Sequence, residues 1–122
     1  MRAWIAVGAL SAAMAVLAGA FAAHGLKARL SPELLAVWET AARYQLVHAV
    51  ALVALGAAAP VLRLSGATAA AVLFVAGTVL FCGSLYALAV TGVRGLGAVA
   101  PIGGLAFVAG WACLAWAAVQ GR

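Results

Sequence analysis

The chain has 122 residues, of which 69% are hydrophobic and 7% are charged, and its formal net charge is +5. Soluble domains contain about 45–50% apolar and about 25% charged residues, and a domain this small keeps much of its surface in water. The composition therefore excludes an ordinary water-soluble domain and predicts an integral membrane protein. The seven Lys and Arg residues are scattered singly near segment ends. This distribution is typical of bilayer anchoring and argues against nucleic-acid binding.

Four apolar stretches reach the ~20 residues that a membrane-spanning helix needs. They predict transmembrane helices at about 3–23, 41–59, 67–91 and 101–120. Helices are expected because lipid leaves no partner for unpaired backbone groups, and no segment alternates apolar and polar residues as a barrel strand would. Short links around residues 63 and 94 predict antiparallel neighbours. We therefore expect an all-α fold: one membrane domain over 1–122, built as a four-helix up-down-up-down bundle with both termini on one side.

The first segment follows Arg2 and could be mistaken for a signal peptide, but its apolar run is too long for a typical signal sequence. We expect a true membrane helix. Gly8, Ala12, Ala15 and Gly19 are spaced by four, three and four residues, which places them on one face. Small residues let helix backbones approach closely in lipid, so this face predicts helix packing. Its partner, another helix of the chain or a second copy, stays open.

The second helix has a strong start signal at residues 31–33. Ser31 can cap free N–H groups, Pro32 lacks the hydrogen that would be unpaired there, and Glu33 suits the positive helix end. The helical pattern then continues past the length that the hydrocarbon requires. We predict that residues 32–40 form an interfacial amphipathic lead-in before the second span.

The segment WETAARYQLVH (38–48) gathers polar residues at the entrance to the second span. At 100° per residue, Tyr44 and His48 share one face of the helix. Glu39 and Arg43 lie on the opposite side, at the i, i+4 spacing that predicts a salt bridge at the membrane interface. The segment therefore carries two separate polar faces.

His48 lies roughly 10 Å into the membrane, counting from residue 41 at ~1.5 Å per residue. An ionisable group at that depth is a functional-site hypothesis. The alternative is a neutral imidazole, bonded to Tyr44, Gln45 or a neighbouring helix, that holds the bundle together. His24 suggests bis-histidine haem ligation with His48, but the two differ in depth, and no Cys or carboxylate lies at ligand spacing from either. We predict no metal site and no cofactor.

The fourth span begins with GLGAVAPIGG (95–104), where proline presets the helix start and glycines allow close approach to the backbone. Gly103 and Gly110 form a second small-residue stripe. Cys82 and Cys113 are predicted to differ in depth by ~9 Å, too far for a disulfide. The up-down order places this turn near the polar entrance, and the candidate polar or ligand site comprises His24, Glu39, Arg43, Tyr44, His48, Pro101, Gly103 and Gly104.

Four motifs carry a family resemblance: GAFAAHGL (19–26), WETAARYQLVHA (38–49), FCGSLYALAVTG (81–92) and PIGGLAFVAGW (101–111). Together they resemble the YgdD family of small four-helix membrane proteins of unknown function. That family has bacterial members and a related small mitochondrial transmembrane protein in animals. The chain departs from the family pattern at Ala22, Cys82 and Ala100, where glycine, serine and threonine are usual. The resemblance implies a multi-pass protein of the bacterial inner membrane, without an established activity.

Three functions remain as alternatives. The first is a non-enzymatic accessory or structural component, which has the lipid bilayer and either itself or a larger membrane complex as partners. The second is a small oligomeric transporter or channel with a polar site lined by His48 and Tyr44. The third is an enzyme acting on a lipid or quinone, for which the sequence offers few acid, base or nucleophilic groups. We favour the first and expect no enzymatic activity.

Overall fold

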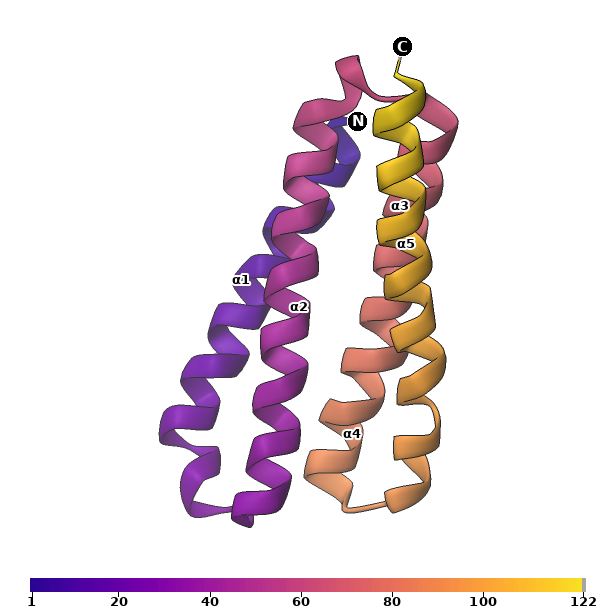
Figure 1. Cartoon of the computed structure of the whole chain (residues 1–122). Helices are drawn as coiled ribbons and strands as arrows, with labels where there is room; N and C mark the ends of the chain where they lie inside the picture. Colours follow the sequence, from indigo (N-terminus) through magenta and orange to yellow (C-terminus); the bar gives the residue numbers. More distant parts are fainter. Residues whose placement is uncertain (122) are drawn as a thin grey trace.

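The computed structural model describes residues 1–121, which form helices joined by short turns and contain no strand (Figure 1). The α-helices are α1 (Arg2–His24), α2 (Pro32–Ala58), α3 (Leu64–Gly77), α4 (Gly83–Thr91) and α5 (Ala100–Gln120). A π-helical turn, η3 (Thr78–Cys82), joins α3 to α4, and short 3₁₀ turns lie at η1 (Leu26–Ala28), η2 (Ala59–Val61) and η4 (Arg94–Ala98). The predicted all-α class is confirmed.

Four helical segments are long and apolar enough to cross a membrane: Arg2–His24, Pro32–Val61, Leu64–Thr91 and Arg94–Gln120. They run alternately up and down, and both ends of the described chain lie at the same end of the bundle (Figure 1). The predicted up-down-up-down membrane bundle is therefore confirmed. The opposite end carries the turns between α1 and α2 and between α4 and α5.

The second span and its predicted lead-in form one continuous helix, α2. The Ser31 hydroxyl accepts a hydrogen bond from the Leu34 backbone N–H at 3.2 Å, which satisfies one free donor of the first turn. Pro32 occupies the first helical position, as the start signal predicted. The helix gives way to a 3₁₀ turn at Ala59, next to Pro60, whose ring is unsuited to a helix interior. Residues 32–40 thus belong to the same helix as the span.

The four segments pair into two helical hairpins. Helix α1 packs along α2, α3 packs along α5, and the pairs meet where α2 contacts η3 and α4. In the first hairpin, the buried residues Gly8, Ala15 and Ala22 of α1 recur every seven residues. A Cβ placed at Gly8 would lie 2.7 Å from the Ala49 carbonyl oxygen, so glycine there permits backbone contact.

The predicted stripe on α1 and the observed contact face differ. Gly8 and Ala15 are buried, but Gly19 is exposed, and a Cβ placed there has no neighbour within 4 Å. Helix α2 instead lies over Ser11 and Ala18, whose carbonyl oxygens accept side-chain hydrogen bonds from α2. Those bonds set the rotation of α1 about its axis. Residue size alone does not distinguish the face of α1 that contacts α2 from the adjacent face that carries Gly19.

The second hairpin closes around glycines on both helices. Gly103 and Gly110 of α5 are buried, Gly103 against the backbone of Phe81 and Gly110 against Phe74. A Cβ at Gly110 would lie 2.7 Å from Phe74 Cδ1. In lipid, dispersion across such close contacts replaces the hydrophobic force that drives packing in water.

The π-helical turn interrupts the third span, which the sequence predicted as an unbroken helix. Its wide turn is closed by the Gly83 N–H, which donates to the Thr78 carbonyl oxygen. Two hydroxyls support the surrounding backbone: Thr78 donates to the Phe74 carbonyl at 2.8 Å and Ser84 to the Phe81 carbonyl at 3.0 Å. The turn places the Phe81 backbone directly against Gly103.

We predict that Gly8→Ala destabilises the fold by about 1–3 kcal/mol, because the added methyl group overpacks the contact between α1 and α2. Gly19→Ala, the same change on an exposed turn of the same helix, should leave stability unchanged or slightly raised. Unfolding of the purified protein by denaturant in mixed micelles measures both. Equal stabilities for the two variants would contradict the observed contact face.

Candidate functional site

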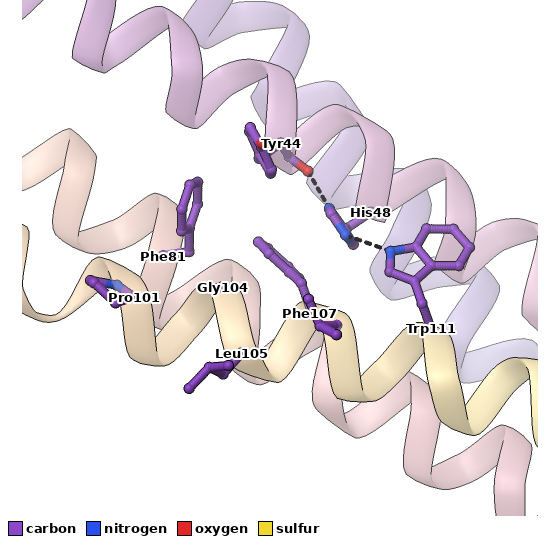
Figure 2. A pocket seen from close by; sticks show the side chains of 9 residues that line it. Tyr44, His48, Phe81, Pro101, Gly104, Leu105, Phe107 and Trp111 are labelled. Carbon is purple, nitrogen blue, oxygen red and sulfur yellow. Dashed lines mark hydrogen bonds between the residues drawn. The ribbon is translucent and has the colours of Figure 1, made fainter.

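A groove of about 600 Å³ lies between α2, η3 and α5 (Figure 2). Its lining is mainly apolar and aromatic: Tyr44, His48, Phe81, Pro101, Gly104, Leu105, Phe107, Val108 and Trp111. A lining of this kind, with a few placed polar groups, is typical of sites for apolar ligands. The groove is open to the surface of the bundle, where the lining residues Tyr44, Leu105 and Val108 are exposed.

Both ring nitrogens of His48 are engaged inside the protein (Figure 2). Nε2 accepts a hydrogen bond from the Trp111 indole N–H at 3.0 Å, and Nδ1 lies 2.8 Å from the Tyr44 backbone carbonyl oxygen. An indole N–H only donates and a carbonyl only accepts. The imidazole is therefore neutral, with its proton on Nδ1, and it joins α2 of the first hairpin to α5 of the second.

Aromatic rings enclose the His48 side chain, which is 4% exposed. The Phe107 ring stacks on the imidazole with 3.6 Å between ring centroids and 13° between planes. Phe74 meets it edge-on at 5.4 Å. Protonation would place a second N–H against the Trp111 donor inside this apolar enclosure, so the arrangement favours the neutral form.

Tyr44 forms the more open part of the groove and is 41% exposed. Its ring lies 4.7 Å from the Phe81 ring and 6.3 Å from the Phe107 ring, between centroids. Its backbone carbonyl holds His48, whereas its hydroxyl makes no hydrogen bond to any residue between 1 and 121. Tyr44 thus presents a polar group that lipid or a ligand can reach.

A second polar cluster joins three helices away from the groove. The Gln45 amide donates to the carbonyl and hydroxyl oxygens of Ser11, each at 3.2 Å, and the Tyr86 hydroxyl donates to Gln45 Oε1 at 2.7 Å. Trp38 packs its ring 4.6 Å from Tyr86 and donates its indole N–H to the Ala18 carbonyl at 2.8 Å. This cluster holds α1, α2 and α4 together.

The structure divides the predicted site residues. Four of them line the groove, namely Tyr44, His48, Pro101 and Gly104, and Gly103 packs behind it against η3. Glu39 and Arg43 line a separate recess beside α1, on the opposite side of α2, and the exposed His24 lies in neither. The predicted grouping of these residues in one candidate site is therefore wrong, because α1 packs on α2 and the groove forms between α2 and α5.

The predicted Glu39–Arg43 salt bridge is also wrong. Within residues 1–121, the ion pair that falls within 4 Å joins Arg94 to Glu33, at 3.5 Å and on the surface. The i, i+4 spacing brings the two side chains within reach of each other, but it does not require them to pair. Glu39 and Arg43 remain exposed and unpaired with each other.

Sequence reasoning missed three residues that fix the interior: Ser11, Tyr86 and Trp111. Each carries a polar atom in an otherwise apolar span, which was the signal available. Among the described residues, no three His, Cys, Asp or Glu side chains gather in a way that could hold a metal ion. Cys82 and Cys113 are free thiols.

Comparison with known proteins places the chain among membrane proteins without an assigned activity. The family model described as a protein of unknown function, DUF423, matches residues 18–104. A UPF0382 membrane protein of Staphylococcus haemolyticus is 46% identical over 114 residues, covering 93% of each chain. The UPF0382 membrane protein YwdK of Bacillus subtilis is 43% identical over 123 residues, covering 98% of each. No solved structure matches the chain significantly.

We predict that His48→Phe lowers stability by about 1–2 kcal/mol, because it removes the hydrogen bond between the hairpins and leaves the Trp111 N–H without its acceptor. His24→Phe, at an exposed position, serves as the control and should have no such effect. Denaturant unfolding in mixed micelles measures both changes. An unchanged midpoint for His48→Phe would show that the bond does not hold the hairpins.

Proposed function

The chain belongs to the DUF423 family of proteins of unknown function, and on that premise we propose that it is a non-enzymatic accessory component of a membrane. It would act by packing against other membrane proteins rather than by transforming a substrate. The observation that carries this proposal is the engagement of both His48 nitrogens. A general acid or base needs a nitrogen that can exchange a proton with its substrate, and His48 has none free.

The rest of the interior supports the same proposal. No buried side-chain nitrogen or oxygen within residues 1–121 lacks a hydrogen-bond partner. Gln45 and Tyr86, two further polar side chains in the middle of the helices, are hydrogen-bonded to each other. Polar groups that are hydrogen-bonded to each other stabilise a fold. A catalytic or transport site, by contrast, keeps some polar groups available for a ligand.

The cytoplasmic membrane of a bacterium is the proposed location. The relatives reported above come from bacteria. Helical spans suit that membrane, whereas proteins of the bacterial outer membrane are barrels of strands. We also propose that the wider family is the YgdD family and includes the small mitochondrial transmembrane protein of animals. The four motifs at 19–26, 38–49, 81–92 and 101–111 support that assignment.

One observation favours the alternative function, a small oligomeric transporter or channel. Tyr44 and His48 line the same groove, and Tyr44 is exposed at the surface of the bundle. A pathway between copies would use the free Tyr44 hydroxyl and would need His48 to release Trp111. We rank this alternative second because the intact His48–Trp111 bond opposes it.

The test uses the tagged protein at its native abundance in the host bacterium, extracted in a mild detergent. We expect a larger membrane protein to co-purify in a fixed ratio. We also expect the double variant His48→Phe, Trp111→Phe to keep that partner. Replacing both members of a hydrogen bond by apolar rings of similar shape costs far less than replacing one.

A second result would overturn the accessory function. A homo-oligomer without a protein partner, whose loading with a small molecule is lost in the double variant, would make the chain a transporter or binding protein. The variant must retain wild-type helicity by circular dichroism for this comparison. Arg63→Gln, in the turn between α2 and α3, provides a control for nonspecific loss during extraction.

A further inference from the structure

The recess beside α1 is lined mainly by residues that are exposed rather than packed in the interior of the bundle. Glu39, Arg43 and Leu46 of α2 line it on one side, and Val16 and Gly19 of α1 on the other. Its volume is about 320 Å³. All five residues are exposed. The recess therefore lies on the outer surface of the first hairpin, where a neighbouring protein can reach it.

The charged pair belongs to a longer exposed stripe on α2. Four exposed residues follow each other at spacings of four, three and four: Glu39, Arg43, Leu46 and Val50. Residues spaced in this way form one seam along a helix, the pattern by which helices pack side by side. The seam is distinct from the faces that bind α1 and α5. No helix of the described chain covers it.

Two opposite charges without partners make this seam unusual. Counted from residue 41 at ~1.5 Å per residue, Arg43 lies about 3 Å inside the second span, and Glu39 lies just outside it. Charged residues within membrane spans almost always pair with one another or face a protein interior, because lipid solvates them poorly. Neither Glu39 nor Arg43 takes part in an ion pair within the described chain. The seam carries one positive and one negative charge, so it is complementary to itself.

We propose that this seam is the interface of a homodimer, in which Glu39 of each copy pairs with Arg43 of the other. A two-fold axis along the membrane normal makes the two α2 helices parallel, with the same seam contributed by both copies. The paired residues then differ by about 6 Å along the axis, which the long arginine side chain can bridge. The exposed Gly19 leaves room beside α2 for the second copy to approach.

The dimer is independent of the proposed accessory function. It needs only the outer surface of the first hairpin and leaves the groove with His48 free. It also explains why Gly19, which does not contact α2, stands at small-residue spacing from Ala15. The first helix then has two small-residue faces, one within the chain and one toward a second copy.

The test measures energy transfer between donor- and acceptor-labelled copies of the full chain in vesicles of phosphatidylethanolamine and phosphatidylglycerol. Glu39→Arg and Arg43→Glu should each weaken self-association at least tenfold, because each variant faces itself with four like charges. An equimolar mixture of the two variants should restore association as a heterodimer. In that mixture, each charge of one chain meets an opposite charge on the other.

Association in the mixture of the two variants distinguishes the proposed dimer from other partners for the two charges. A pair formed within one chain, or an Arg43 that binds lipid phosphate, predicts no restoration on mixing, and that result would overturn the proposal. Wild-type chains that remain monomeric would also overturn it, as would single variants that associate like the wild type. Circular dichroism of each variant verifies that the helices are intact.

Two further variants test the interface if a charge reversal at Glu39 or Arg43 impairs folding. Gly19→Leu fills the recess from an exposed position with no neighbour within 4 Å, so it should weaken association at least tenfold without loss of helicity. Arg29→Glu reverses an exposed charge in the turn that precedes the same helix, outside the seam, and should leave association unchanged. Unchanged association in Gly19→Leu would contradict the proposed interface.

Discussion

The structure depends on one constraint: a polar group within an apolar span must find its partner inside the protein, because lipid offers none. The buried polar side chains of residues 1–121 meet that constraint, several of them with hydrogen bonds that cross between helices. His48 receives the Trp111 N–H, and Gln45 joins Ser11 to Tyr86. Because hydrophobic burial gives little force between helices in lipid, these bonds and the glycine contacts supply much of the specificity. Each polar residue therefore selects one helix rotation and one neighbour.

Helix α2 is the central element because its faces have different partners. One face packs on α1 through Gln45 and Ala49, and another holds His48 against α5. The third face carries Glu39 and Arg43 at the surface. The first two faces explain how two hairpins become one bundle. The third face remains available for contacts with another chain. Such contacts can neutralise charges that would be costly against lipid.

The candidate site follows from the same geometry. The π-helical turn brings the Phe81 backbone against Gly103, which sets the floor of the groove next to the His48–Trp111 bond. The groove is consequently aromatic, and its histidine is held in one tautomer. Such a site suits packing or an apolar ligand better than proton transfer. The relatives of the chain are membrane proteins of unknown function, so the geometry of the groove is the main guide to the role of the site.

The sequence by itself determined the fold class, the four spans and their up-down order, because length, hydropathy and capping are local properties that act before any tertiary contact. The Ser31 cap illustrates this. It also indicated His48 as the residue to explain. Only the tertiary structure decided which faces meet. Gly19 and Ala18 are both small, yet the Trp38 indole bonds to the Ala18 carbonyl. The contact of His48 with Trp111 of α5 and the π-helical turn likewise depend on contacts between distant segments, which local patterns do not encode.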